Sequence, residues 1–324
     1  MRLICIIGKI FEIAFIFFII LTVLFFLFRL SPGDPISRIV DPSLTAEDMT
    51  RMISQLGLDR SLWDQYILYL KHFFTGDFGV SFHYGLPVGK IIKERLGWTL
   101  LLFTSSTILA AFAGIYLGKI AAWKKGSFLD NMMSLSALVC YTLFIPWFAL
   151  LMLWLFGFKL AICPLGGVLT PTLWAGASGL NMPRFFDLIQ HMMLPLMTLF
   201  IINLGSYLLL MRSSMLTVLK EDYIITARAK GLSEKVIRDK HAAKNAALPV
   251  ITSVGLSLAF SINGGALTEQ IFSWPGIGRE LIFAVSNNDY PLAQACFLLI
   301  ALVVLVANMI VDLLYVWLDP RITY

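Results

Sequence analysis

The sequence predicts an all-α integral membrane protein with six transmembrane helices. Of its 324 residues, 58% are hydrophobic and 14% are charged, whereas a soluble domain carries about 25% charged residues. Six uncharged runs approach the length of about 20 residues that a helix needs to cross a bilayer, and flanking charged side chains can complete the shorter ones. The runs are residues 13–28, 97–118, 131–158, 188–211, 245–268 and 290–311.

Residues 1–30 are predicted to form an N-terminal transmembrane helix rather than a signal peptide. Arg2 and Lys9 precede the apolar core, as they would in a signal peptide. However, the core is longer than the usual 7 to about 15 residues, and residues 29–32 are not a small-residue cleavage site. We therefore expect this segment to be retained.

Residues 31–96 are predicted to form an extracytoplasmic loop that folds into a small cap. Thr45 and Asp48 have the spacing of a capping box, and Gly57 could end the helix that they begin. A second amphipathic helix is expected over residues 62–74. Its apolar face would carry Leu62, Tyr66, Tyr69, Leu70 and Phe73.

Residues 97–324 are predicted to form a five-helix core within a single membrane domain. The run 160–183 is also uncharged, but glycine and proline interrupt it repeatedly. Irregular backbone exposed to lipid would leave amides unpaired, so we expect an external loop there. The stretch FSWPGIG at residues 272–278 is predicted to be a tight external turn, with Trp274 in the interfacial aromatic belt.

The distribution of basic residues predicts that both termini lie in the cytoplasm. Six spans place the loops 119–130 and 212–248 on the side of the termini, and these loops hold three and eight Lys and Arg. The short loops on the opposite side, 159–187 and 269–289, hold two and one. The positive-inside rule therefore favours N-in, C-in. The net charge of +5 follows from this bias and does not indicate nucleic-acid binding.

The segment 212–248 is a polar island between two apolar runs. Its eight basic and four acidic residues cannot lie in hydrocarbon. Residues 220–230 are compatible with a helix, Gly231 would break it, and Ser233 could cap a second helix over 234–243 before Pro249 opens the fifth span. Two short helices attached to two spans could pass force from a cytoplasmic partner into the bundle.

This segment resembles the EAA loop of the permease subunits of ATP-binding cassette importers, in the dipeptide/oligopeptide/nickel family. The resemblance rests on Tyr223, on ARAKGL at 227–232 and on HAAKNAALPVIT at 241–252. Residues 225–227 read Ile-Thr-Ala where the broader family pattern has Glu-Ala-Ala. Further stretches similar to the family occur in its order. They are SPGDP at 31–35, GDFGVSF at 76–82, FSWPGIGRE at 272–280 and DPRITY at 319–324.

The resemblance implies a multi-pass permease subunit in the plasma (inner) membrane of a prokaryote. Its partners would be a second homologous permease, two ATP-binding cassette ATPases, an extracytoplasmic substrate-binding protein and membrane lipid, with no nucleic acid. A coupling helix between the fourth and fifth spans would dock on the ATPase. Coupling is assigned to Tyr223, Ala227, Ala229, Lys230, Gly231, Leu232, His241 and Pro249. Peptides are the favoured cargo, with nickel or another metal chelate as the alternative.

Asn203, Asn263 and Asn308 are candidates for lining a polar path through the spans. Hydrogen bonding between helices explains buried amides equally well and ranks first. His191 and His241 are too isolated to predict a metal site.

The chain is predicted to have no catalytic residues and to bind no cofactor. The sequence contains no G-x-x-x-x-G-K-[ST] motif, so ATP and Mg²⁺ would be bound by partner ATPase subunits. An ion-coupled secondary transporter is a second hypothesis, disfavoured because the spans are nearly free of acids. An intramembrane enzyme is a third, and no catalytic motif on the spans supports it.

Overall fold

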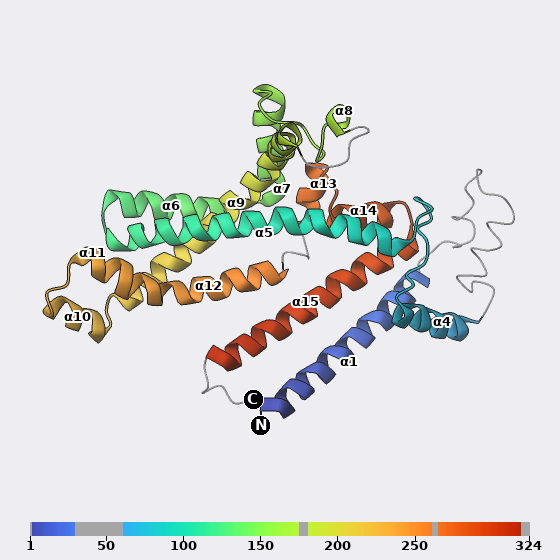
Figure 1. Ribbon diagram of the computed structural model, residues 1–324, viewed down its shortest axis with the longest axis horizontal. Helices are drawn as coiled ribbons and strands as arrows, with labels where there is room; N and C mark the ends of the chain where they lie inside the picture. The colour runs from blue at the N-terminus through green and yellow to red at the C-terminus, as the bar shows by residue number, and fades with distance from the viewer. Residues whose placement is uncertain (1, 30–60, 175–180, 261–264, 319–324) are drawn as a thin grey trace. The chain divides into compact units, whose positions relative to one another are not determined.

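The computed structural model describes residues 2–29, 61–174, 181–260 and 265–318 (Figure 1). All regular elements in these ranges are helical, apart from an isolated bridge between Val80 and Pro87. The prediction of an all-helical protein is therefore confirmed. The predicted capping box at Thr45, the helix end at Gly57 and the SPGDP motif lie outside the described residues.

The chain divides into two compact units. Unit 1 comprises residues 1–97 and 276–324, and unit 2 comprises residues 98–275. The predicted division into residues 1–30, 31–96 and 97–324 stays a prediction. Unit 1 contains α1 (Arg2–Arg29), α4 (Leu62–Thr75), the start of α5 (Val88–Trp123), α14 (Ile277–Ser286) and α15 (Tyr290–Leu318).

The core of unit 1 forms where α1 packs along α15. Leu21 and Leu24 of α1 are buried in one cluster with Leu292 and Cys296 of α15. The first and last apolar runs are therefore neighbours within this unit. Asp289, just before α15, accepts hydrogen bonds from the Ser81 hydroxyl and from the backbone N–H of His83.

The predicted helix at residues 62–74 is present as α4. Ser61 occupies its N-cap, and Gly76 ends it with a positive φ of 73°. Tyr66 is buried and its ring lies 5.2 Å from that of Phe25 on α1. The predicted apolar face is wrong at one position, because Leu62 at the first turn is exposed.

Unit 2 holds the remainder of α5 and ten further helical segments within the described residues. They are α6 (Phe128–Thr142), α7 (Ile145–Met152), η1 (Leu153–Lys159), α8 (Pro171–Trp174), α9 (Met182–Val218), α10 (Asp222–Ala229), α11 (Glu234–Val236), η2 (Ile237–Ala242), α12 (Ala243–Phe260) and α13 (Ala266–Ile271). The two η segments are π-helices. α9 packs against α6, α7 and α12, so it is the central helix of the unit.

Three helical stretches in the described residues are long and apolar enough to cross a membrane. They are Phe11–Arg29, Val88–Trp123 and Met182–Val218. A bent pair, Phe128–Thr142 with Ile145–Lys159, would make a fourth. Within α15, the stretch Tyr290–Val306 is a shorter apolar helix. The count of six spans and their N-in, C-in orientation stay predictions.

The third apolar run, residues 131–158, is not one continuous helix as predicted. α6 ends at Thr142, and the chain resumes in α7 at an angle of 101°. Leu143 and Phe144 between them have extended backbone, and Pro146 lies in the first turn of α7. In a continuous helix Pro146 would have no N–H to donate to the carbonyl of Thr142, and its ring would clash with that carbonyl. Composition alone revealed the apolar run, but not this break.

The loop 160–174 is largely irregular, as predicted, and is fixed to α9 by one carboxylate. Asp187 accepts hydrogen bonds from the Thr170 backbone N–H at 2.9 Å, the Thr170 hydroxyl at 2.5 Å and Trp174 Nε1 at 2.9 Å. The guanidinium of Arg184 lies 5.5 Å from the ring centre of Trp174. A helix side chain thereby satisfies polar groups that the loop leaves unpaired.

The prediction that Trp274 lies in an interfacial belt is wrong. Its side chain is fully buried, and its Nε1 donates a 3.0 Å hydrogen bond to the backbone oxygen of Trp98. The two indole rings meet edge to face with centroids 5.9 Å apart. A buried indole needs a partner for its N–H, and α5 provides one.

Candidate functional site

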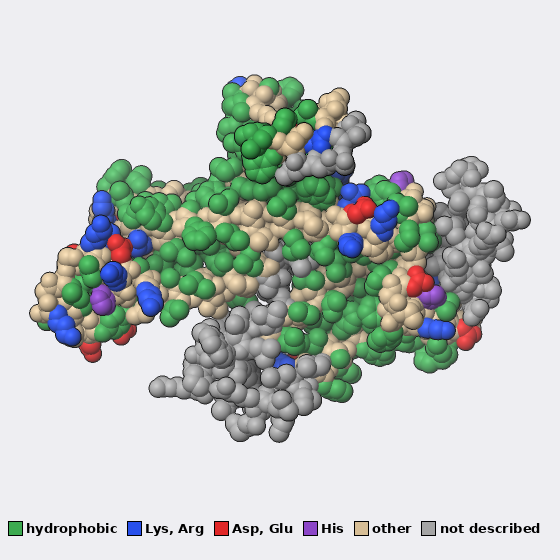
Figure 2. All heavy atoms as spheres, in the orientation of Figure 1, with side chains coloured by type: hydrophobic (Ala, Val, Ile, Leu, Met, Phe, Trp, Pro, Cys, Tyr) green, Lys and Arg blue, Asp and Glu red, His purple; other side chains and the backbone are tan. Residues whose placement is uncertain are grey.

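The segment predicted to contact a cytoplasmic partner is built at one end of unit 2 (Figure 1). α9 continues beyond its apolar run to Val218, and a short turn at residues 219–221 leads into α10. Figure 2 shows charged side chains gathered where α10 and α11 lie, next to the hydrophobic surfaces of α5 and α6. Such a boundary between charged and apolar surface is expected where helices leave a membrane.

An apolar core fixes this segment to the long helices. Ile224 and Ala227 are three residues apart on one face of α10, and both are buried. Ile237 and Ala242 of η2 are fully buried in the same cluster. The other buried members include Met211 and Met215 of α9, Ala122 of α5, and Ala246 and Val250 of α12. Burial of each isoleucine contributes about 1.5–3 kcal/mol, so α10 and η2 are packed firmly onto the helix ends.

Gly231 forms the turn that the sequence predicts between the two parts of the segment. Its φ is +74°, in the left-handed region that glycine adopts without strain. The Gly231 N–H bonds the oxygen of Arg228 at 2.9 Å, and the Leu232 N–H bonds the oxygen of Ala227 at 3.3 Å. This pair of bonds is the Schellman motif that closes many helices. A Cβ at Gly231 would meet no atom within 4 Å, so only the backbone conformation requires glycine.

Residues 222–232 of the segment present three large hydrophobic side chains among charged ones. Ile225 is 59% exposed, and Tyr223 and Leu232 are exposed as well. The Tyr223 hydroxyl accepts a 2.8 Å hydrogen bond from Asn245 Nδ2, which holds the ring against the start of α12. Apolar side chains exposed together on a charged segment can form part of a surface that another protein covers.

Asp239 of η2 joins the segment to α5. Its Oδ1 lies 3.0 Å from Lys119 Nζ, and the neighbouring Arg238 contacts both carboxylate oxygens at 3.0 and 2.8 Å. Hydrogen bonds from Arg238 and Lys119 hold the pKa of Asp239 well below its usual range. The carboxylate is therefore charged at neutral pH, and two cations share it.

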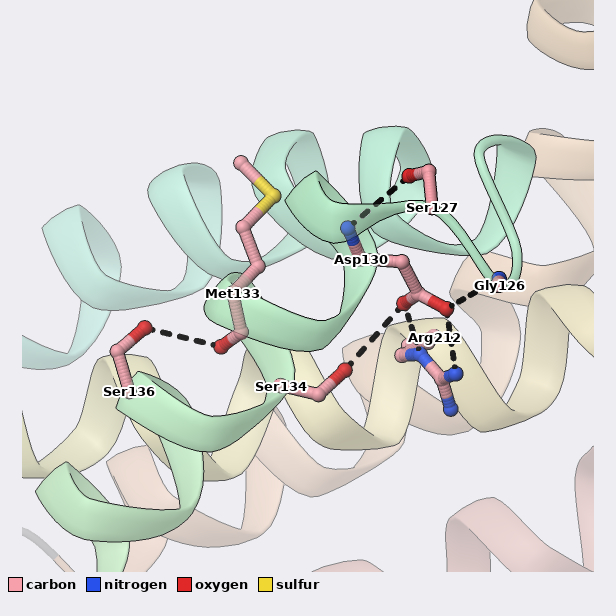
Figure 3. A network of polar contacts seen from close by, with 7 residues as sticks. All are labelled: Gly126, Ser127, Asp130, Met133, Ser134, Ser136 and Arg212. Atoms are coloured by element: carbon pink, nitrogen blue, oxygen red, sulfur yellow. Dashed lines mark hydrogen bonds and ion pairs between the residues drawn. The ribbon is translucent and has the colours of Figure 1, made fainter.

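A second network joins α6 to α9 near the same end (Figure 3). Asp130 accepts from Arg212 Nε at 2.6 Å and from Arg212 Nη2 at 2.8 Å, which is a bidentate geometry. The Gly126 N–H and the Ser134 hydroxyl donate to the same carboxylate at 3.0 and 3.3 Å. The Ser127 hydroxyl caps the helix by accepting from the Asp130 N–H at 3.2 Å. The loop 124–127 is thereby tied to α9.

The structure brings most of the predicted coupling residues together at this end of unit 2. Tyr223, Ala229, Lys230, Gly231, Leu232 and Pro249 are exposed, Ala227 is buried and His241 is half-buried. Among the predicted path residues, Asn203 is half-buried on α9 and Asn308 is exposed on α15, whereas Asn263 lies outside the described residues. A role for these three in lining a path stays a prediction.

Two details of the predicted segment are wrong. The second helix is not a regular helix over residues 234–243, because α11 is three residues long and continues as the π-helix η2. Ser233 occupies the N-cap position without a side-chain cap hydrogen bond. In addition, Pro249 does not open the next helix, since it lies inside α12, which begins at Ala243. The long helix therefore starts within the polar segment.

The residues missed by sequence reasoning are the charged partners Lys119, Asp130, Arg212, Arg238 and Asp239. Lys119, Asp130 and Arg212 directly flank apolar runs, which the sequence does show, whereas Arg238 and Asp239 lie within the polar segment. Their pairing could not be read from the sequence, because Arg212 and Asp130 are 82 residues apart.

Two family models match the chain. Residues 114–324 match the model described as binding-protein-dependent transport system inner membrane component. Residues 2–103 match the model for the N-terminal part of such membrane components. Together the two matches cover nearly the whole chain.

Curated relatives match over almost their full length. The chain is 39% identical over 306 residues to a protein of Brucella suis biovar 1, which covers 93% of each chain. It is 36% identical over 327 residues to the dipeptide transport system permease protein of Escherichia coli strain K12, covering 95% of each. It is 37% identical over 302 residues to an oligopeptide transport system permease protein of Bacillus subtilis strain 168, covering 93% of each.

Proposed function

The chain belongs to the family of binding-protein-dependent transport system inner membrane components, as a permease of the peptide branch of ATP-binding cassette importers, and we propose that it forms the translocation path together with a second permease and couples that path to cytoplasmic ATPases. Peptides are the proposed cargo, supported by the names of the Escherichia coli and Bacillus subtilis relatives. The chain itself performs no chemistry, and ATP is bound and hydrolysed by the partner subunits.

The observation that carries the coupling role is the combined geometry of the segment 212–248. Its inner face is buried against α5, α9 and α12, whereas its outer face exposes Tyr223, Ile225 and Leu232. A segment with one face packed against long helices and the other exposing apolar side chains can bind a partner and transmit its movement to those helices. The proposed partner is the ATPase, because the segment follows a long apolar helix and carries the basic excess of a cytoplasmic loop.

The proposed cycle assigns mechanical work to this segment. Closure of the ATPase pair around ATP displaces α10 and the Gly231 turn, and the displacement passes into α9 and α12, which are continuous with the segment. The path then opens outward, where an extracytoplasmic binding protein delivers the peptide. Release of the ATPase pair after hydrolysis returns the path to its inward-facing state.

Co-purification from gently solubilised membranes tests the docking surface. We expect the tagged wild-type chain to retain a second permease and an ATPase. Ile225→Glu should keep the second permease and lose most of the ATPase, because loss of a central apolar contact weakens an interface by about 30-fold or more. Ile225 is exposed, so the change leaves the core of the segment intact.

Two substitutions at Gly231 test whether ATPase binding requires the left-handed backbone conformation of the turn. Gly231→Val should reduce ATPase retention, because a β-branched residue is strained at positive φ. Gly231→Asn should behave nearly as wild type, because asparagine tolerates this conformation and the site has room for its side chain. Full ATPase retention by both Ile225→Glu and Gly231→Val would contradict the proposal. Recovery of the wild-type chain alone, or as a homo-oligomer, would instead favour an ion-coupled carrier.

A further inference from the structure

One face of α5 is directed at the π-helix η2. Tyr116, Lys119 and Trp123 are separated by three and four residues, so they share a face near the end of α5. Lys119 Nζ pairs with Asp239 at 3.0 Å and lies 5.4 Å from the centre of the Tyr116 ring. The Arg238 guanidinium lies 6.0 Å from the centre of the Trp123 ring. Both cations that hold Asp239 therefore also lie over aromatic rings of α5.

Asp239 occupies the centre of this arrangement. It forms ion pairs with Lys119 of α5 and with Arg238, the preceding residue in η2. Ile237 of η2 and Ala122 of α5 are buried in one shared apolar core. The contact between η2 and α5 thus combines buried apolar side chains with an ion pair.

The ion pair between Arg228 and Glu234, also within the segment, does not involve α5. Arg228 and Glu234 approach to 3.2 Å across the Gly231 turn, and their side chains are 48% and 59% exposed. Asp239 and Lys119 are more enclosed, at 31% and 20%. Removal of Glu234 therefore breaks an ion pair of the same segment without touching its attachment to α5.

We propose that Asp239 is a positioning residue that clamps the coupling segment to the end of α5 through Lys119, so that displacement of the segment also moves α5. This inference rests on the proposed coupling function. Without the clamp, α9 and α12 still follow the segment, because they are continuous with it. α5 is not continuous with the segment, and Lys119 is its charged link to η2.

The π-helix supports this assignment. Segments with this wider turn are rare and often occur at functional sites. Here the wide turn extends over residues 237–242 and includes both Arg238 and Asp239. The local geometry that presents these two side chains to α5 is thus specific to this part of the segment.

The test uses the complete importer in proteoliposomes, with peptide transported per ATP hydrolysed as the readout. Asp239→Asn and Lys119→Gln should each lower this ratio about threefold, as expected for the loss of a partly exposed ion pair that biases a conformational equilibrium. The double variant should be no worse than either single one, because both remove the same link. Glu234→Gln is the matched control and should keep the wild-type ratio. Lys119→Arg keeps the positive charge and should also keep the wild-type ratio of peptide transported to ATP hydrolysed.

The outcomes separate the clamp from the proposed function. A normal ratio in Asp239→Asn and Lys119→Gln, with the ATPase bound and stimulated, would overturn the clamp while leaving coupling intact. Additive losses in the double variant would also overturn it. Failure of the wild-type chain to retain an ATPase would reject the proposed function itself. If Asp239→Asn does not fold, the contrast between Lys119→Gln and Lys119→Arg decides, because both change only α5.

Discussion

At the scale of single residues, the two partners of the Asp130–Arg212 pair differ in how deeply they are buried. The side chain of Asp130 is 1% exposed and that of Arg212 is 26% exposed. Removing one member of a buried ion pair is costly because the other charge is left without a partner, by about 3–5 kcal/mol. The cost should therefore depend on which charge remains.

We expect Arg212→Met to destabilise the protein more than Asp130→Asn. The first change leaves a carboxylate in the interior, whereas the second leaves an arginine that can still reach water. Thermal unfolding of the purified protein in detergent, followed by tryptophan fluorescence, measures the difference. Arg228→Gln serves as a control and should change the free energy of unfolding by about 1 kcal/mol or less, since its pair is exposed. Equal effects of Arg212→Met and Asp130→Asn would show that the burial of the remaining charge does not determine the loss of stability.

At the scale of helices, α6 and α9 approach so closely that only glycine fits at their crossing. A Cβ on Gly205 of α9 would lie 2.4 Å from the oxygen of Ala137 and 2.9 Å from the nitrogen of Tyr141, both on α6. These are backbone atoms of a regular helix, so they cannot move aside independently. Small residues at helix crossings are a general feature of membrane proteins, because they allow close packing of the backbones.

Gly205→Ala should therefore force the two helices apart and lower stability by about 1–3 kcal/mol, the usual cost of overpacking. Gly89→Ala is the matched control. It lies on α5 with no atom within 4 Å of the added Cβ, and alanine favours the helix. The melting temperatures of both variants in detergent provide the measurement. A stable Gly205→Ala protein would mean that the α6–α9 crossing is looser than described.

At the scale of the whole molecule, the predicted orientation can be tested with single cysteines in a cysteine-free background. Lys90→Cys in the predicted extracytoplasmic loop should react with a membrane-impermeant maleimide in intact cells. Lys124→Cys and Lys235→Cys should react only after permeabilisation, because the positive-inside rule places their loops in the cytoplasm. All three lysines are exposed, so burial would not prevent labelling. Labelling of Lys235→Cys from outside would reverse the orientation.

The sequence by itself determined the features that depend on neighbours along the chain. Composition and apolar runs predicted an all-helical membrane protein, and α4 was predicted from its amphipathic pattern. The charged segment 212–248 and its turn at Gly231 were also predicted, because a helix end and a left-handed glycine are encoded locally. The resemblance of its motifs to the permease family was confirmed by the family models over both halves of the chain.

Only the tertiary structure decided which distant residues meet. The burial of Trp274 depends on a backbone oxygen 176 residues earlier, at Trp98. Lys119 meets Asp239, and Asp130 meets Arg212, because the helices that carry them pack side by side near one end of unit 2. The break after Thr142 was likewise visible only in the structure, because a straight helix and a bent pair can have the same apolar composition. Composition and local propensity fix what each segment is, whereas packing between helices fixes which side chains become partners.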